Sequence, residues 1–192
     1  MTFEDPYRDP DTGVLLNNLG LTDRHACETA EARLSALRIG QLEMSPLPGL
    51  YDLAHLKAFH RHIFGDLYPW AGEVRKVDIA RTSSFAHWRH IDSYSDHLFG
   101  ELRGQRHLVG LGREDFADRF THFFAETNAL HPFREGNGRA QRAFYRQMAL
   151  HAGWQVDFAL VDVEKYGDVC RESMAGSSAP LRALLDSVIS PA

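Results

Sequence analysis

Residues 131–142, HPFREGNGRAQR, combine one histidine, one acidic side chain, two glycines around an asparagine and three arginines, of which Arg139 and Arg142 are three residues apart. His131 can take up a proton near neutral pH, which suits it to act as a general base. Glu135 stands immediately before Gly136 and Gly138, and glycines let an anion approach the backbone closely. The stretch therefore predicts a site where an imidazole and a carboxylate meet a bound anion.

A helix is expected to open at about Asn137, and its start would make the glycine segment a phosphate cradle. The first N–H groups of a helix have no partner within it and carry partial positive charge. Arg139 and Arg142 are three residues apart, so they share a helix face and suit more than one phosphate. Glu135 suits Mg²⁺, which is held by one or two carboxylates together with substrate phosphates and water. His131 would then activate a hydroxyl that attacks a phosphate.

The same residues also have ordinary structural interpretations. Glu135 and Arg139 could form a local ion pair, and His131 could simply end a helix. Gly136 and Gly138 could be turn glycines. The functional interpretation is favoured because so many residues suited to one chemistry rarely occur together by chance in one short stretch.

The elements that must position this stretch are mostly helical. Apolar residues at helical spacing predict helices at about 22–44, 52–64, 91–102, 115–130, 137–153, 162–175 and 179–189. Thr22 or Asp23 is expected to cap the first helix. Its expected apolar stripe is Ala26, Ala30, Leu34, Leu37 and Leu42.

Two segments depart from the helical pattern. Residues 1–20 contain two prolines and two glycines and are expected to form an irregular arm. Residues 74–89 change period, with Val77 and Ile79 on one face, which predicts a short β-hairpin lying on the helices. The expected fold class is mainly α: one domain over 1–192, a helical bundle with one short β-hairpin beside the loop.

Composition and charge limit the classes of function and the locations that the sequence allows. The chain has 192 residues and a formal net charge of -5, which argues against direct nucleic-acid binding. No apolar run is long enough to span a membrane and no secretory leader is visible, so the default location is the bacterial cytoplasm. Delivery into a host cell by a machine that reads other signals stays open. No P-loop and no nucleophile elbow is present in the sequence.

The cysteines and a group of histidines are expected to have structural rather than catalytic or metal-binding roles. Cys27 and Cys170 fall in amphipathic helical stretches and are predicted to be buried free thiols. His55, His60 and His62 lie on one predicted helix and are expected to be surface or boundary residues, with a metal site disfavoured.

Residues 131–142 match the Fic family signature, H-P-F-x-[D/E]-G-N-G-R-x-x-R, at every specified position. The stretches DPYRDP, DLAHLKAFHRHIFGDLYPWAGEVRKVDI and FAETNALHPF also resemble the bacterial Fic toxin branch, so the resemblance covers nearly the whole chain. It implies a mainly helical fold in which a hairpin called the flap, here 74–89, lies beside the active-site loop. It also implies transfer of AMP from ATP to a Tyr, Thr or Ser hydroxyl of a target protein.

The resemblance assigns roles to the motif residues. His131 would be the general base, Glu135 would hold Mg²⁺ on the α- and β-phosphates, and Phe133 would pack the loop. The residues implied to bind the nucleotide phosphates are Gly136, Asn137, Gly138, Arg139 and Arg142.

The flap carries the weaker part of the resemblance, because it has no strict motif. Arg81, Thr82 and Phe85 are implied to clamp a target segment by strand pairing. Relatives suggest a type II topoisomerase subunit or a host protein as the target.

Gly138 separates two reaction classes within the resemblance. The Doc branch carries lysine at this position and phosphorylates its target, whereas glycine keeps the cradle open and favours AMP transfer. A phosphotransferase or another nucleotidyl transferase is the first alternative. A non-catalytic nucleotide-binding module is the second.

Regulation is inferred from a missing pattern. Many Fic proteins carry an inhibitory helix with the pattern [S/T]-x-x-x-E-[G/N], whose glutamate pairs with the second motif arginine, here Arg142. The only glutamate followed by Gly or Asn in this sequence is Glu135, and His131 occupies the position that requires Ser or Thr. The resemblance therefore implies a toxin whose inhibitory helix comes from a separate small antitoxin.

Overall fold

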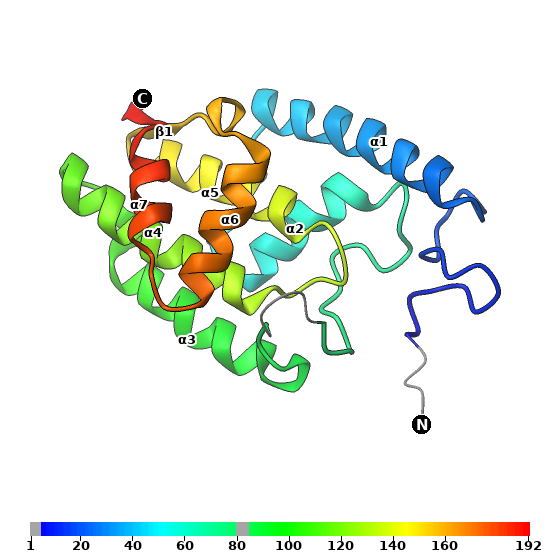
Figure 1. Ribbon diagram of the computed structural model, residues 1–192. Coiled ribbons are helices and arrows are strands. Elements are labelled where there is room, and N and C mark those ends of the chain that lie inside the picture. Colours follow the sequence, from blue (N-terminus) through cyan, green and yellow to red (C-terminus); the bar gives the residue numbers. More distant parts are fainter. Residues whose placement is uncertain (1–4, 80–84) are drawn as a thin grey trace.

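The computed structural model describes residues 5–79 and 85–192, and residues 1–4 and 80–84 lie outside the described part. The mainly helical prediction is confirmed (Figure 1). The α-helices are α1 (Arg24–Met44), α2 (Leu53–Phe64), α3 (Ile91–Gly104), α4 (Arg113–Leu130), α5 (Asn137–His151), α6 (Val163–Met174) and α7 (Ala179–Asp186). Short 3-10 turns occur at Trp88–His90, Arg106–Leu108 and Phe158–Leu160, and the strands are β1 (Trp154–Val156) and β2 (Ile189–Pro191). No described helix is both long and apolar enough to cross a membrane.

Aspartate caps explain where three of these helices begin. The carboxylate of Asp23 accepts a hydrogen bond from the N–H of Ala26, as expected for the start of α1. Asp52 caps α2 and Asp162 caps α6 in the same way. Each cap satisfies one of the donors that a helix start leaves unpaired.

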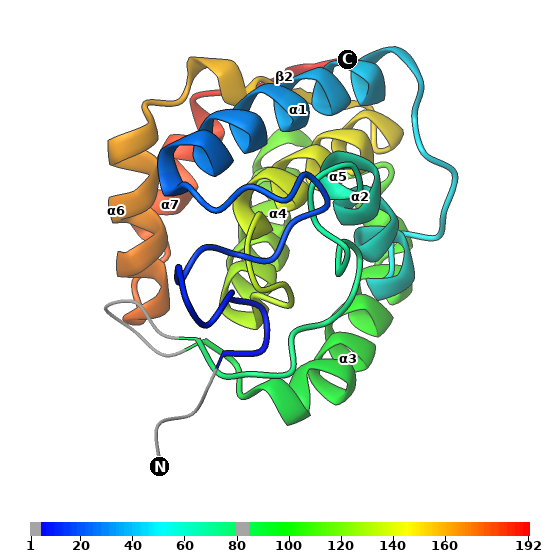
Figure 2. The ribbon, with the colours of Figure 1, turned by 90° about the vertical axis from the view of Figure 1, so that its right-hand side faces the viewer.

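The helices α4 and α5 form the centre of the bundle, and the loop that joins them carries residues 131–136 (Figures 1 and 2). One face of α4 is fully buried through Phe116, Phe120, Phe123, Phe124 and Leu130. Buried polar bonds lock the pair: the Tyr145 hydroxyl donates to the Phe123 carbonyl at 2.8 Å, and the Gln141 amide donates to the Phe124 carbonyl at 2.6 Å. This rigid pair fixes the position of the loop.

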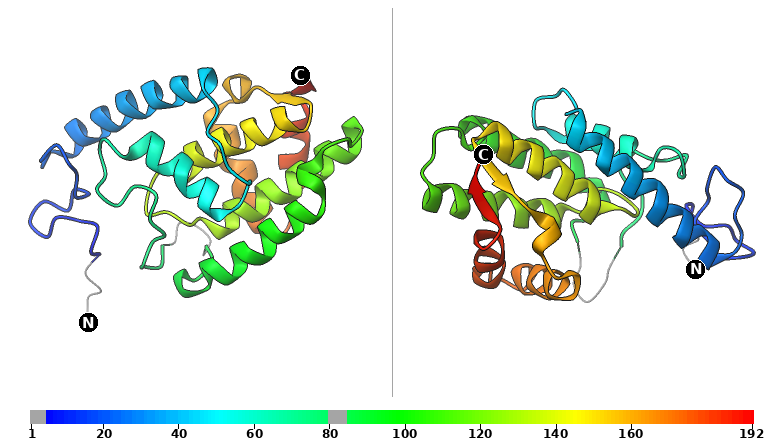
Figure 3. Two further views of the ribbon diagram at one scale, coloured as in Figure 1. Left: turned by 180° about the vertical axis from the view of Figure 1, so that it is seen from behind. Right: turned by 90° about the horizontal axis from the view of Figure 1, so that it is seen from above.

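The helix α1 lies along the outside of α2 (Figures 2 and 3). Its buried residues are Cys27, Ser35 and Leu42. The expected apolar stripe is wrong at Leu37, which is 59% exposed. The reason is geometric, since the row through 27, 35 and 42 faces the core and Leu37 lies off that row. Cys27 and Cys170 are buried free thiols, as predicted.

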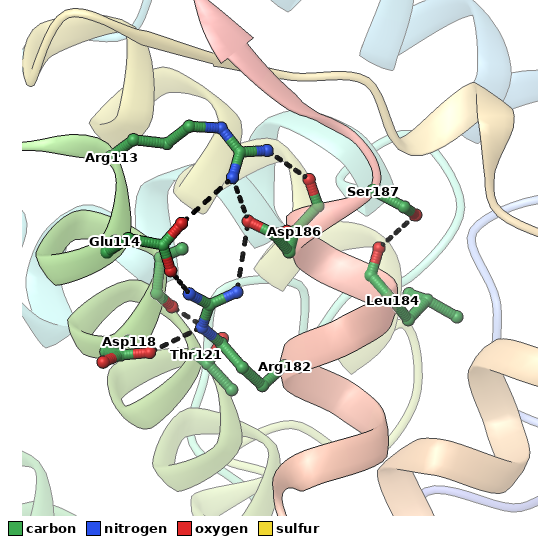
Figure 4. Close-up of polar contacts among 9 residues, drawn as sticks. Arg113, Glu114, Asp118, Thr121, Arg182, Leu184, Asp186 and Ser187 are labelled. Carbon is green, nitrogen blue, oxygen red and sulfur yellow. Dashed lines mark hydrogen bonds and ion pairs between the residues drawn. The ribbon is translucent and has the colours of Figure 1, made fainter.

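The C-terminal helix α7 packs against α4, and an ion network joins the two helices (Figure 4). The Arg182 guanidinium contacts Asp118 at 2.6 Å and Glu114 at 3.0 Å, both on α4. Arg113 reaches Asp186 at 2.6 Å. In the same part of the chain β1 pairs antiparallel with β2, from Trp154 opposite Pro191 to Val156 opposite Ile189, a pairing the sequence did not predict. These contacts hold α6 beside the central loop, because α6 packs on both α4 and α7.

The flap over 74–89 lies beside the loop as expected, but its described residues, 74–79 and 85–89, contain no strand. The expected strand over 74–79 is therefore wrong. The backbone groups are used differently: the N–H of Arg75 donates to the Pro132 carbonyl at 2.9 Å, and the N–H of Ala86 donates to the Ala129 carbonyl at 3.0 Å. Each arm of the flap is thus hydrogen-bonded to the α4–α5 connection.

The arm before α1 is irregular over its described residues, as predicted, yet it is tied to the body of the protein. Asp5 pairs with Arg134, whose Nε lies 3.0 Å from a carboxylate oxygen. Burial raises the pKa of Asp5, but the hydrogen bonds from Arg134 and from the N–H of Tyr7 lower it further, so the net pKa lies below its ordinary value. The Tyr7 hydroxyl accepts a hydrogen bond from the N–H of Lys76. The arm therefore braces the base of the flap.

Candidate active site

The loop between α4 and α5 begins and ends with left-handed backbone. His131 caps α4 with φ 45° and ψ 62°, and its N–H donates to the Thr127 carbonyl at 3.1 Å. Gly136 precedes α5 with φ 77°. A left-handed residue at each end turns the chain sharply, so that the end of one central helix feeds the start of the next.

Asn137 closes this loop from inside. Its amide accepts from the N–H of Phe133 at 2.8 Å and donates to the Phe133 carbonyl at 2.7 Å. Asn137 is predicted from the sequence to lie in the anion cradle, and it lines the cavity beside His131. Its side chain, however, holds the loop in shape, and this leaves its backbone N–H at the helix start as the group suited to an anion.

The His131 imidazole has a defined tautomer. Its Nδ1 lies 3.2 Å from the Asn128 carbonyl, and because a carbonyl can only accept, Nδ1 carries the proton. In the neutral ring the lone pair is then on Nε2. The ring stacks on Phe85 of the flap, with centroids 3.7 Å apart. This orientation is the one that a general base requires, with one nitrogen anchored and the other basic.

A cavity of about 300 Å³ opens beside His131. The structure brings together His131, Glu135, Gly136, Asn137, Gly138, Arg139 and Arg142 along its walls. Phe133 is not among them, because it is buried beneath the loop as predicted. Arg81 and Thr82 lie outside the described residues.

The opposite wall of the cavity comes from α6, which sequence reasoning missed. Its lining residues are Tyr166, Gly167, Cys170, Arg171 and Met174. They recur at helical spacing on one face of α6. Gly167 lies within that face, and a small residue there was the signal in the sequence that could have identified this wall. Burial raises the pKa of Tyr166 and of Cys170, so both stay protonated at neutral pH.

The glycines of the motif differ in what surrounds them. A Cβ on Gly138 would meet only the Nη1 of Arg142, at 3.4 Å. A Cβ on Gly136 would lie 2.4 Å from a ring carbon of Phe64. Gly136 is therefore required by packing and backbone conformation, whereas Gly138 keeps open a space at the helix start.

The two arginines reach different walls of the cavity. The Arg139 guanidinium pairs with Glu31 and donates to the Ser35 hydroxyl at 3.0 Å, both on α1. The alternative of a local Glu135–Arg139 ion pair does not occur. The Arg142 guanidinium lies over the Tyr166 ring, 5.1 Å from its centroid. A phosphate between them would be contacted from two sides.

Glu31 also accepts a hydrogen bond from Tyr68. Burial, followed by this contact with Glu31, raises the pKa of the Tyr68 phenol. Tyr68 and Arg139 therefore both contact Glu31, so the arginine is paired before any nucleotide arrives.

Glu135 is the residue that suits a metal ion. Its carboxylate accepts from the N–H of Gly136 at 3.2 Å and lines the cavity. The described residues contain no group of three or more His, Cys, Asp or Glu side chains arranged for a metal. One carboxylate beside a phosphate cradle fits Mg²⁺, which takes its other ligands from phosphates and water.

His60 supports the loop from below, and the expectation of a surface or boundary histidine is wrong for it. Its Nε2–H donates to the Glu135 carbonyl at 2.9 Å, and its Nδ1 accepts from the N–H of Gly72 at 2.8 Å. Its ring stacks on Phe133 at 3.9 Å. Burial lowers the pKa of His60 to about 4, so it is neutral and fixed in one tautomer.

His55 is buried as well and again contradicts the expectation. Its Nδ1 accepts from the N–H of Tyr51 at 3.2 Å, and its Nε2 lies 3.0 Å from the Leu47 carbonyl. Both ring nitrogens are thus satisfied by backbone groups, which allows the ring to be buried.

Comparison with known proteins places the motif in a family context. The sequence model described as the Fic/DOC family matches residues 50–149. "Protein adenylyltransferase VbhT" of Bartonella schoenbuchensis is 41% identical over 94% of this chain, which spans 38% of that relative's length. "Probable protein adenylyltransferase Fic" of Salmonella typhimurium is 37% identical over 98% of this chain and 94% of its own. The BepC protein of Bartonella tribocorum, solved with bound AMPPNP, superposes with a TM-score of 0.94 at 25% identity over 100% of both chains.

Proposed function

This chain belongs to the Fic/DOC family, and from that premise we propose that it is a protein adenylyltransferase that moves AMP from ATP to a Tyr, Thr or Ser hydroxyl of a target protein. The observation that carries the proposal is the single cavity where His131, Glu135, the start of α5 and two arginines meet. Relatives named protein adenylyltransferases are 34–41% identical over most of this chain. The AMPPNP-bound relative supports ATP as the co-substrate.

The residues of the cavity divide the reaction between them. The Nε2 lone pair of His131 takes the proton of the acceptor hydroxyl while the hydroxyl oxygen bonds to the α-phosphorus of ATP. The bond from that phosphorus to the bridging oxygen breaks, and pyrophosphate leaves with the electron pair. N–H groups at the start of α5, together with Arg139 and Arg142, bind the negatively charged oxygens.

Glu135 would hold Mg²⁺ at this site. Bound Mg²⁺ supplies positive charge that offsets the charge on the phosphate oxygens. For Arg139 to bind a phosphate, it must first release Glu31, because the two side chains are paired without nucleotide. Metal-dependent nucleotide binding that is unchanged in Glu135→Ala, measured by calorimetry, would exclude this role for Glu135.

The reaction class is tested with two labels. ATP labelled at the α-phosphate should mark a target band in cell lysate, and ATP labelled at the γ-phosphate should not. His131→Ala should lower labelling by roughly 10²–10⁴-fold, the usual contribution of a general base. His97→Ala is the matched control, since the His97 side chain is 73% exposed and lies outside the cavity. Labelling from the γ-phosphate alone would favour the phosphotransferase, and labelling from neither would favour the non-catalytic module.

The regulatory partner is proposed to be a small antitoxin. A second cavity, of about 520 Å³, lies on the other side of Arg139 and Arg142, between α1, α5 and residues 155–159. Its mixed lining of apolar side chains and arginines suits an amphipathic helix that carries one glutamate. We place the [S/T]-x-x-x-E-[G/N] helix of the antitoxin there, with its glutamate on Arg142. Expression of this chain alone should then arrest growth, and normal growth with measurable AMP transfer would contradict the toxin role.

The target is proposed to dock on the flap, close to His131. Phe85, which stacks on His131, lines both the nucleotide cavity and a polar cavity of about 420 Å³ that also contains Arg8 and Asp78. A target segment in this polar cavity would bring its hydroxyl to the His131 imidazole. A type II topoisomerase subunit in the bacterial cytoplasm, or a protein of a host cell, is the proposed target, and identification of the labelled lysate band decides between them.

A further inference from the structure

Arg75, at the start of the flap, is buried in an unusual way for a charged residue. Its exposed fraction is 1%, and its side chain is fully covered. The carboxylate that lies near it is Asp78, at 3.7 Å, and the Asp78 side chain is more than half exposed. Burying a guanidinium is costly unless its donors are satisfied, so the partners of Arg75 identify what the burial achieves.

Those partners are backbone carbonyls from three separate places. The Nε of Arg75 donates to the His131 carbonyl at 2.8 Å, and the Nη1 donates to the Val77 carbonyl at 2.8 Å. The Nη2 donates to the Ala86 carbonyl, which belongs to the second arm of the flap. One planar fork therefore joins the catalytic histidine to both arms of the flap.

The contact with His131 falls on a residue in a strained conformation. His131 is left-handed at φ 45°, a region that is unfavourable for a residue with a Cβ. Its N–H, its Nδ1 and its carbonyl are each bonded, to Thr127, Asn128 and Arg75 in turn. Of these three bonds, the one through Arg75 links the orientation of the imidazole to the flap rather than to α4.

We propose that Arg75 is a positioning residue, which holds the target-binding flap and the His131 base in one fixed arrangement. This inference rests on the proposed function, because the flap matters for catalysis only if a target docks there. Lysine cannot replace Arg75, since an ammonium group is a point donor and cannot span three carbonyls with a planar fork. The nucleotide site is outside its reach: Arg75 contacts none of residues 136–142 in the bonds that hold it.

The test compares Arg75→Lys with Arg61→Lys. Arg61 lies on α2 near the same turn, pairs with Glu73 at 2.9 Å and is mostly exposed, so its replacement controls for loss of an arginine. Amide hydrogen exchange, nucleotide affinity by calorimetry and the rate of α-phosphate labelling in lysate are measured for both. Arg75→Lys should speed exchange in residues 74–79, 85–90 and 129–133 by about tenfold or more, because buried carbonyls lose their partner.

The same variant should label targets about 10–100-fold more slowly while its affinity for AMPPNP changes less than about threefold. Arg61→Lys should leave all three quantities near wild type. A purely structural role would accelerate exchange throughout the protein and leave labelling at low temperature unchanged, and that result would overturn the proposal. Unchanged exchange in the three segments would overturn it as well.

One further measurement and the hydrogen-exchange result keep the inference separate from folding and from the proposed function. If Arg75→Lys does not fold, the Arg75 Nε–H signal of the wild-type protein is followed by NMR. Slow exchange of that proton with water supports the proposal, and fast exchange overturns it. If the wild-type protein labels no target, the proposed function fails, whereas local exchange in Arg75→Lys still decides whether Arg75 couples the flap to His131.

Discussion

Replacing Gly136 with alanine should separate the packing role of the motif glycines from their phosphate role. Gly136 has φ 77°, where a residue with a Cβ costs about 1–2 kcal/mol. The new Cβ would also lie 2.4 Å from the Phe64 ring, which is itself fully buried. Overpacking of this kind costs about 1–3 kcal/mol, so the free energy of unfolding should fall by about 2–5 kcal/mol in total.

Gly138→Ala is the matched control for this change. Its Cβ would meet only the flexible end of Arg142 at 3.4 Å, and alanine is favoured over glycine in a helix by up to about 1 kcal/mol. Gly138→Ala should therefore unfold at the same or higher urea concentration than the wild type. Its affinity for AMPPNP should nevertheless fall, because the methyl group occupies the cradle at the start of α5.

Urea unfolding followed by circular dichroism measures both variants, and calorimetry gives the nucleotide affinity. The expected result is a crossed pattern, in which Gly136→Ala loses stability and Gly138→Ala loses affinity but not stability. Equal stability of Gly136→Ala and wild type would refute the packing argument. Full nucleotide affinity in Gly138→Ala would refute the cradle.

Three further outcomes follow from contacts around the site. The pKa of His60 is about 4 in the folded state and about 6.5 when unfolded, so stability is complete above pH 6.5 and falls by about 3 kcal/mol as the pH drops to 4. Urea titrations across that range should show the slope in wild type and a smaller one in His60→Gln. Asn137→Ala removes both buried bonds to Phe133 and should cost about 2–4 kcal/mol, seen as a lower Tm, whereas Asn18→Ala at an exposed site should cost far less. Glu31→Gln removes the carboxylate that occupies Arg139 and should tighten AMPPNP binding about fivefold by calorimetry, and weaker binding would contradict this competition.

The parts of the site that sequence reasoning found are those encoded locally. The helix start at 137, the glycines and the two arginines lie within one short stretch, so their spacing alone places them on one cavity. The helix α1 could be anticipated for a similar reason, because the Asp23 cap and the apolar spacing act over a few residues.

The parts that were missed depend on segments far apart in the chain. Arg139 is paired with Glu31, more than 100 residues earlier, and nothing near either residue signals the pairing. His60 is buried because a distant carbonyl, that of Glu135, and the N–H of Gly72 satisfy its ring. Tertiary partners of this kind decide burial, and local periodicity carries no information about them.

The flap shows how a correct position can accompany a wrong secondary structure. Alternation of Val77 and Ile79 indicated a strand, since period-two patterns are typical of strands. Arg75 accounts for the difference, because its guanidinium is turned inward and donates hydrogen bonds to the carbonyls of Val77 and Ala86. The described arms are held by the side chain of one arginine and by the α4–α5 connection, which a strand pattern cannot predict.

A crystal structure of the protein with AMPPNP and Mg²⁺ would test the proposed nucleotide site most directly. We expect phosphates on the N–H groups at the start of α5, with Arg139 released from Glu31 and Arg142 in contact with the phosphates. We also expect the metal on Glu135 and the α-phosphorus on the side of His131 Nε2. Nucleotide bound away from residues 131–142, with the Arg139–Glu31 pair intact, would contradict this arrangement of the site.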